Sequence, residues 1–282
     1  MLKISYYPGC TLLSSAKEFD ESSRAVLHHL DIEPLELPDW NCCGATSAHN
    51  ISSYLAIALN ARNLAIAEKM GLDVVIPCAA CFNRLKAAEK ALIKNEFKEF
   101  PFEGKIKVHN LLYFLYNSYF LDQISKKKKI SLSNIKAVAY YGCLVTRNPK
   151  ITDISEYEYP NSMDEILKAV GVNCIPWAYK TDCCGAALTV ARPEIVYKLV
   201  ARLYDEAIRA GAECIAVACP LCHANLDMKQ QEINKTYGKD YYIPIFYFTE
   251  LLGLSFGLNE TRVWLSRHFV DPRPFLREKR LY

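Results

Sequence analysis

The sequence predicts an α/β protein made of two pseudo-symmetric lobes that arose by internal duplication. A cysteine pattern occurs twice, the segments between the cysteines match in order, and each copy alternates helical segments with short apolar strands. We expect the first lobe to span residues 1–130 and the second to span residues 131–282, with the boundary in the lysine-rich segment KKKKISLSN.

Each copy of the pattern contains five cysteines. A single cysteine follows a strand-like run and a glycine (SYYPGC, AYYGC), a CCG doublet comes next (NCCGATSAHN, DCCGAALTVA), and a C-x-x-C motif follows (PCAAC, ACPLC). In both copies, 34 residues separate the doublet from the C-x-x-C motif. Five cysteines in one order, at nearly constant spacing, indicate a duplication.

The segments between the cysteines also correspond. Residues 53–71 and residues 193–211 have apolar residues at helical spacing, and each segment ends at a glycine. A short buried strand follows each helix, at 73–77 and at 213–218, and leads into the C-x-x-C motif at the start of another helix. The cysteines are therefore expected at strand ends, where open α/β sheets bind their ligands.

Five cysteines per copy favour an iron–sulfur cluster over other uses of thiols. A structural zinc ion takes four ligands, and disulfides would leave one thiol unpaired in each copy. Iron–sulfur clusters are normally held by cysteine thiolates. Two adjacent cysteines can reach one centre only from irregular backbone, and Gly44 and Gly185 provide that freedom.

Composition indicates a globular protein of ordinary charge. The 282 residues are 51% hydrophobic and 23% charged, with a net charge of +3, which does not point to nucleic acid as a partner. The chain does not open with the apolar core of a signal peptide, so we expect a cytoplasmic location. Pro244 and Glu250 interrupt the most apolar stretch, residues 243–258, so we expect no membrane span.

Four further residues need an interpretation. Cys174 and Cys214 have no counterpart in the first copy, and we expect them in the core. His49 and His223 lie beside the motifs. They are either ordinary hydrogen-bonded side chains or groups that orient the metal site and donate protons.

With both repeats identified, the chain resembles the cysteine-rich CCG-domain family, and within it the B subunits of heterodisulfide reductases. The segments that carry the resemblance are YYPGC, WNCCGATSAHN, PCAAC, YYGC, DCCGAA, CPLCHANLD and FTELLGLSFGLN. They extend over nearly the whole chain.

The resemblance implies two noncubane 4Fe-4S clusters, each held by all five cysteines of one motif. The first set would be Cys10, Cys42, Cys43, Cys78 and Cys81, and the second Cys143, Cys183, Cys184, Cys219 and Cys222. These ten cysteines would also form the catalytic site.

The resemblance further implies reduction of a small-molecule disulfide, that of coenzyme M and coenzyme B, to two thiols. Electrons would come from the ferredoxin-like C subunit of such reductases. Their flavoprotein A subunit, a hydrogenase or a formate dehydrogenase would in turn supply electrons to the C subunit. Two other classes of function stay open. One is a CCG-domain subunit for another disulfide, or for a lactate, glycolate or quinone-linked oxidoreductase, and the other is a zinc-stabilised scaffold subunit.

Two surface features follow from this function. The substrate would be polyanionic, so at least one cation should face the gap between the clusters. The candidates are Arg62, Arg84, Arg147, Lys180 and Arg192. We expect residues 246–258 and the tail 269–282 to dock the electron-donating partner, with an ordinary core helix and a tail packed on its own lobe as the alternatives.

Overall fold

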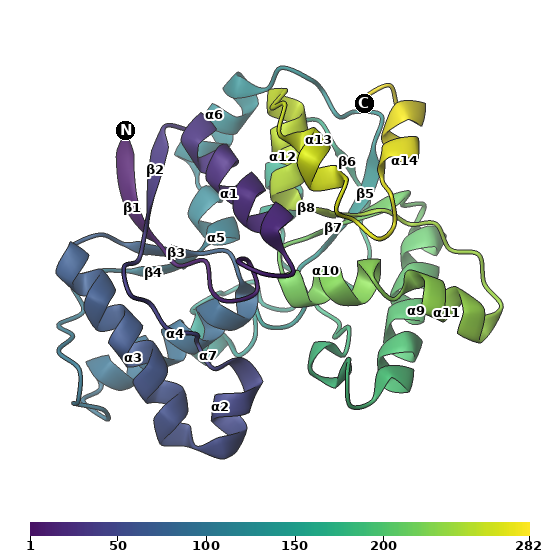
Figure 1. Ribbon diagram of the computed structural model, residues 1–282. Coiled ribbons are helices and arrows are strands. Elements are labelled where there is room, and N and C mark those ends of the chain that lie inside the picture. The colour runs from purple at the N-terminus through teal and green to yellow at the C-terminus, as the bar shows by residue number, and fades with distance from the viewer.

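The structure contains two parallel sheets of four strands, one in each half of the chain (Figure 1). The computed structural model describes residues 1–282, with every side chain except that of Thr46. The strands are β1 Leu2–Tyr6, β2 Ile32–Glu36, β3 Val74–Ile76, β4 Val108–Asn110, β5 Lys136–Tyr140, β6 Asn173–Cys174, β7 Cys214–Val217 and β8 Ile245–Tyr247. Their orders, β2-β1-β3-β4 and β6-β5-β7-β8, are equivalent and confirm the predicted pair of α/β lobes.

The central strands of both sheets are buried. Every residue of β3 and of β7 is buried, as expected for parallel strands that helices cover on both faces. Because all strands within a sheet run in the same direction, their carboxyl ends meet at one edge. The segments that follow β1, β3, β5 and β7 therefore converge within each lobe.

The helices of the first half include the predicted one after the first doublet. They are α1 Lys17–His29, α2 Ala45–Ile51, α3 Ser53–Met70, α4 Ala79–Ile93, α5 Leu111–Leu115 and α6 Ser118–Lys127. Ser52 caps α3 by accepting a hydrogen bond from the Leu55 amide, and Gly71 ends it in the left-handed conformation.

The helices of the second half include the counterpart of α3. They are α7 Pro149–Thr152, α8 Ser162–Ala169, the 3₁₀ helix η1 Ala186–Leu188, α9 Pro193–Ala210, α10 Pro220–Asp227, α11 Gln230–Tyr237, α12 Phe248–Phe256, α13 Thr261–Leu265 and α14 Arg273–Glu278. Helix α9 begins at Pro193 and ends before the left-handed Gly211, as its sequence predicts.

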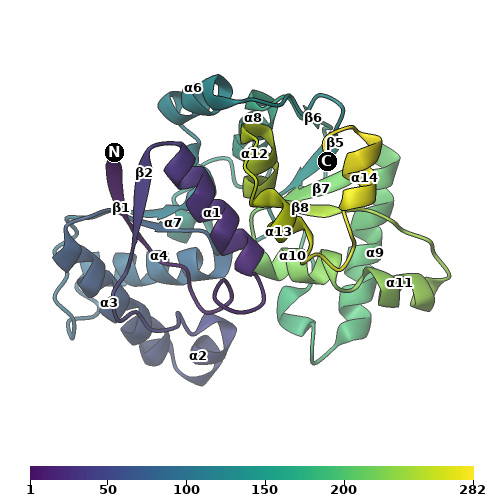
Figure 2. The same ribbon diagram turned by 45° about the horizontal axis from the view of Figure 1, so that its top comes forward.

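The two lobes share an interface in which α1 packs against the second half of the chain. Both views show α1 beside α12 and α13, far from it in sequence (Figure 1, Figure 2). The rings of Phe19 and Tyr247 stack there at a centroid distance of 4.2 Å. The buried hydroxyls of Ser22 and Thr249 lie 2.7 Å apart. These contacts join the lobes into one core.

Of the two segments predicted to dock the partner, residues 246–258 are mostly buried, and the tail 269–282 is partly exposed. All residues of α12 are buried, so the prediction that residues 246–258 form a docking surface is wrong, because α1 and α8 cover this helix. In the tail, Phe275 and Leu276 pack into the core, whereas Phe269 is 63% exposed and Tyr282 is 39% exposed. None of the helices in the described chain combines the length and apolarity needed to cross a membrane.

Candidate metal centre

The first five cysteines converge at the carboxyl edge of the first sheet. Cys10 follows β1, the doublet Cys42 and Cys43 follows β2, and Cys78 and Cys81 follow β3 at the start of α4. The sulfur atoms of Cys10 and Cys42 lie 3.5 Å apart, and those of Cys43 and Cys81 lie 3.3 Å apart. Residues from three loops therefore meet in one group of thiols.

The second five cysteines form an equivalent group. Cys143 follows β5, the doublet Cys183 and Cys184 precedes η1, and Cys219 and Cys222 lie at the start of α10. The sulfur atoms of Cys184 and Cys222 lie 3.6 Å apart. The structure thus brings together, within each copy, the cysteines that the sequence pairs by spacing.

Matching tyrosines hold the two doublet loops in place. The hydroxyl of Tyr7 donates to the carbonyl of Asn41 at 2.9 Å, and that of Tyr140 donates to the carbonyl of Asp182 at 2.7 Å. Each carbonyl belongs to the residue just before a doublet. The segments YYPGC and YYGC contained this signal, although the sequence did not show which loop the tyrosines would reach.

The glycines before the single cysteines are required by close contact with sulfur. A Cβ atom on Gly9 would lie 2.8 Å from the Cys81 sulfur, and one on Gly142 would lie 2.6 Å from the Cys222 sulfur. Both residues also have positive φ, at +74° and +66°. Gly44 and Gly185 adopt the left-handed conformation that the sequence predicts for them.

Hydrogen bonds between neighbouring thiols raise the pKa of one partner and lower that of the other, so that negative charge is stabilised on one thiol of a pair, such as Cys43 or Cys183. Hydrogen bonds from Cys42 and Cys81 lower the pKa of Cys43, and the Arg84 guanidinium acts in the same direction. In the second group, a hydrogen bond from Cys143 lowers the pKa of Cys183, with help from the Gly185 amide. Anionic sulfur is the form that binds metals.

The two thiol groups approach each other across the lobe interface. Hydrogen bonding to Cys222 is the largest effect that lowers the pKa of Cys219 in the second lobe, and the backbone N–H of Ala79, at the start of α4 in the first lobe, acts in the same direction. Nearby, the Asn83 side chain donates to the carbonyl of Arg147 at 2.7 Å. The helices that start at the two C-x-x-C motifs therefore meet at the junction.

The number of thiols within each group suits a cluster better than a single ion. A tetrahedral zinc site, with Zn–S bonds of about 2.3 Å, would bring its sulfur atoms within about 4 Å of one another. Among the described residues, no three cysteine sulfurs lie within 4.8 Å of one another. Five converging thiols in each group exceed the four ligands of a zinc site, and cysteine thiolates are the usual ligands of iron–sulfur clusters.

The remaining cysteines and the two histidines lie in different surroundings. Cys214 is buried in β7 and Cys174 is half-buried in β6; burial raises the pKa of both thiols, which agrees with the predicted core role. His49 is exposed on α2. His223 is buried, with its ring stacked on Tyr247 at 4.2 Å, and burial lowers its pKa, so the ring is neutral.

The candidate cations divide into two classes. Arg84 and Arg147 act on motif thiols, since their charges help to lower the pKa of Cys43 and of Cys183 respectively. These two are the cations that the structure places beside the thiol groups.

The other three candidates have structural or surface surroundings. The buried Lys180 pairs with Asp164 at 2.8 Å, and the exposed Arg192 pairs with Glu194 at 2.5 Å. Arg62 binds the Asp39 carbonyl at 2.6 Å and thereby holds the loop before the first doublet.

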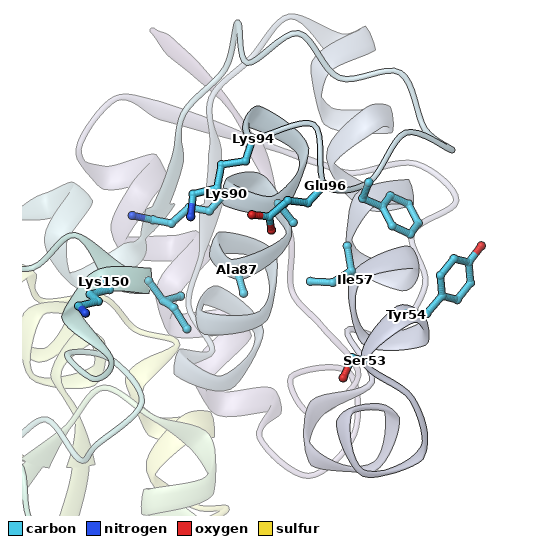
Figure 3. Close-up of a pocket in the computed structure, with 11 residues that line it drawn as sticks. Ser53, Tyr54, Ile57, Ala87, Lys90, Lys94, Glu96 and Lys150 are labelled. Atoms are coloured by element: carbon cyan, nitrogen blue, oxygen red, sulfur yellow. The ribbon is translucent and has the colours of Figure 1, made fainter.

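A pocket of about 510 Å³ is lined by residues of α3, of α4 and the segment after it, and by Lys150 and Ile151 of α7 in the second lobe. Figure 3 shows Lys90, Lys94 and Lys150 on one side of it and Tyr54 on the other. No cysteine lines this pocket. This pocket is therefore lined by other residues than those of the two thiol groups.

Sequence reasoning missed a buried acid–base cluster, which we define as Glu18, Asp227, Glu250 and His268. Each residue comes from a different segment: α1, the end of α10, α12 and the segment after α13. All four are at most 9% exposed. The segment CHANLD drew attention to His223, but no local pattern relates Asp227 to the other three residues.

Comparison with protein families supports this description. The family model of the CCG cysteine-rich domain matches residues 4–86 and 137–227, one segment in each lobe. The fold is similar to that of a solved hypothetical protein from Helicobacter pylori, with a TM-score of 0.73 and 12% identity. That match covers 95% of this chain, which spans about half (52%) of the solved chain.

Curated relatives extend over nearly the whole length. The chain is 29% identical, over 95% of its length and 97% of the relative's, to the 8-methylmenaquinol:fumarate reductase membrane anchor subunit of Wolinella succinogenes. It is 27% identical, over 98% of its length and 96% of the relative's, to the B subunit of a CoB-CoM heterodisulfide reductase of Methanosarcina acetivorans. A protein of Archaeoglobus profundus that is named for its likeness to the heterodisulfide reductase B subunit is 25% identical, over 93% of each chain.

Proposed function

Because the chain belongs to the family of CCG cysteine-rich domain proteins, we propose that it is a redox subunit that holds two noncubane 4Fe-4S clusters and reduces a disulfide between them. The disulfide would be that of coenzyme M and coenzyme B, as in the relatives named as the B subunits of heterodisulfide reductases. The observation that carries the proposal is the presence of two complete, equivalent groups of five thiols that meet at the lobe junction.

All five cysteines of each group would be ligands of one cluster. The ligands would be Cys10, Cys42, Cys43, Cys78 and Cys81 in the first lobe, and Cys143, Cys183, Cys184, Cys219 and Cys222 in the second. When bound, the clusters supply one-electron redox chemistry. The tyrosines and glycines around the thiols would keep the ten sulfur atoms in position before the clusters bind.

The junction between the thiol groups would be the place for the disulfide. Reduction breaks the S–S bond, takes up two electrons and two protons, and releases two thiols. Arg84 and Arg147 would bind anionic substituents of the substrate, because both guanidinium charges already act on motif thiols.

The electrons would come from another protein. The relatives are named as subunits of larger enzymes, which supports the existence of a partner. This partner would be the ferredoxin-like C subunit of these reductases, which would receive its electrons from the flavoprotein A subunit. The exposed tail side chains of Phe269 and Tyr282 are available for such a contact.

The decisive experiment is chemical analysis of anaerobically purified protein. We expect iron and acid-labile sulfide for two four-iron clusters, a paramagnetic resonance signal that changes on addition of coenzyme M, and thiol release from the mixed disulfide when a one-electron donor is supplied. Protein that contains zinc without iron or sulfide would instead be a scaffold subunit.

A second candidate is a subunit that takes electrons from a quinol. It is favoured by the 29% identity, over 97% of its length, to the membrane anchor subunit of a methylmenaquinol:fumarate reductase. A methylmenaquinol analogue should then reduce the clusters, whereas the mixed disulfide should leave reduced clusters unchanged. The two candidates thus give opposite results with one pair of reagents.

A further inference from the structure

The buried acid–base cluster lies at the lobe junction. The His268 Nε2 atom and the Glu250 carboxylate lie 2.8 Å apart, and both side chains are buried. The Asp227 carboxylate accepts the amides of Phe269 and Val270, at 2.8 and 3.0 Å, which places it beside the His268 segment. Glu18 reaches this group from α1 of the first lobe.

A small cavity borders two residues of the cluster and lies beside the second cysteine motif. It holds about 20 Å³, enough for about one water molecule. Glu18 and Asp227 line it, together with Ser15, from the loop that follows Cys10, and Pro220, which directly follows Cys219. Tyr247 lines it too, and its buried hydroxyl has no hydrogen-bond partner among the described residues. A polar group without a partner beside a water-sized space is suited to hold such a molecule.

The duplication does not repeat Glu250 and the neighbouring His223 in the first lobe. His223 and Phe82 follow the last cysteine of their motifs, and Tyr247 and Asn110 end equivalent strands. Three residues after those strand ends come Glu250 and Tyr113. The ionisable side chains of His223 and Glu250 beside the second thiol group therefore correspond to the aromatic rings of Phe82 and Tyr113 beside the first.

We propose that Glu18, Asp227, Glu250 and His268 form a proton reservoir for the chemistry between the two thiol groups, refilled from solvent through the cavity lined by Ser15 and Pro220. The inference rests on the proposed function, in which reduction of one disulfide consumes two protons. Electrons would arrive from the partner protein, and the protons would pass from the reservoir to the two thiolates that form when the S–S bond breaks.

The charges around the reservoir suit this role. Burial raises the pKa of Glu18 to about 7 and raises that of Asp227. Burial opposes protonation of His268, but the Glu250 carboxylate overcomes this effect and raises its pKa to about 9. Protons are therefore held near neutral pH.

The other charged or titratable groups that face the reservoir come from three elements. Arg267 contacts it from the segment after α13 and also pairs with Glu21 of α1. The neutral His223 of α10 packs against the His268 ring, with centroids 4.9 Å apart, and the Tyr247 hydroxyl of β8 lies on the cavity side.

The same residues include a candidate metal-ligand set, His223, Glu250 and His268, with ligand atoms within 4.8 Å of one another. Their hydrogen bonds favour proton storage. Glu250 already accepts both His268 and the Tyr247 amide, the latter at 2.8 Å, and His223 Nε2 lies 3.2 Å from the Ile245 carbonyl.

The test is the pH dependence of the second cluster's reduction potential, measured by paramagnetic resonance in the holoprotein. When reduction is coupled to uptake of one proton, the potential falls by about 59 mV per pH unit. In the wild type we expect the potential to show this slope above pH 7. In Glu18→Gln the slope should be lost between about pH 7 and 8, and in His268→Gln it should be lost near pH 9. Glu89→Gln, a buried carboxylate of the first lobe, is the matched control and should keep the slope.

A second measurement does not need the clusters. Infrared titration should show a protonated carboxyl group near pH 6 that Glu18→Gln removes and Glu89→Gln retains. An unchanged slope in both reservoir variants, or the lack of this carboxyl signal, would overturn the proposal. So would one divalent metal ion per chain that His268→Gln releases. If the slope behaves as expected but no disulfide is reduced, the reservoir stands and the proposed function fails.

Discussion

Phe19 of the first lobe and Tyr247 of the second stack with their ring planes 3° from parallel and their centroids 4.2 Å apart. Both rings are fully buried. On its other face Tyr247 stacks on His223, which directly follows the last cysteine of the second motif. A single column of rings therefore links helix α1 of the first lobe to the second thiol group.

Removal of the Phe19 ring should weaken the whole molecule. We expect Phe19→Ala to lower the free energy of unfolding by about 3–5 kcal/mol, because it leaves a cavity in the shared core. Urea denaturation measures this change. Tyr119→Ala removes a ring that is 64% exposed and should cost less than about 0.5 kcal/mol. Similar losses in the two variants would show that the lobes do not depend on this stack.

Each cluster should depend on its own doublet. We expect Cys43→Ala or Cys184→Ala to lose or distort one cluster while the other lobe keeps its cluster, because each five-thiol group lies within one lobe. Iron and sulfide content per chain measures the effect. Cys214→Ala changes a buried cysteine outside the motifs and should retain all the iron. Full iron content and turnover in a doublet variant would refute the five-ligand assignment.

The glycine before Cys143 should be needed for cluster binding. In Gly142→Ala the new Cβ would lie 2.6 Å from the Cys222 sulfur, so we expect loss of the second cluster. Gly211→Ala is the matched control. Gly211 also has positive φ, at +90°, but a Cβ there meets nothing within 4 Å. Both variants carry backbone strain, and only Gly142→Ala should lose iron. Equal iron contents would show that the sulfur contact is unimportant.

Glu18 should make stability depend on pH. Its pKa is about 7 in the folded protein against an ordinary value of 4.5. Between these values the folded protein holds a proton that the unfolded chain has released, so stability falls as the pH rises from 4.5 to 7. Glu18→Gln removes this cost. It should be more stable than the wild type by on the order of 2–3 kcal/mol above pH 7 and equally stable below pH 4.5. Parallel stability curves for the two proteins would contradict the raised pKa.

The exposed part of the tail should contribute to partner binding. We expect Phe269→Ser to slow electron transfer from a ferredoxin-like partner several-fold, because an exposed aromatic ring is typical of interface anchors. Reduction by an artificial one-electron donor should not change. Tyr119→Ser, at an exposed ring on the first lobe, is the control. If partner-dependent transfer is the same in all three proteins, Phe269 lies outside the docking surface.

Much of the fold could be predicted because its signals are local. Helix α3, the strand β3 and the start of α4 follow one another between Ser53 and Ala79, and each has its own period or stop signal. The burial of α12 on all sides could not be predicted in this way. Its apolar sequence suits a core helix and a docking surface equally well, and it is buried because α1, more than 200 residues earlier, packs on it.

By itself, the sequence determined the duplication, the two α/β lobes and the grouping of ten cysteines into two sets of five. It could do so because cysteine spacing and strand–helix alternation repeat along the chain. Tertiary structure alone decided that the start of α4 meets Cys219, that Arg84 and Arg147 lie beside the thiols, and that Glu18 joins Asp227, Glu250 and His268. The physical reason is that these contacts join residues that are far apart in the chain, some within one lobe and some across the junction, and burial in the folded protein is what changes the proton affinity of the acid–base cluster.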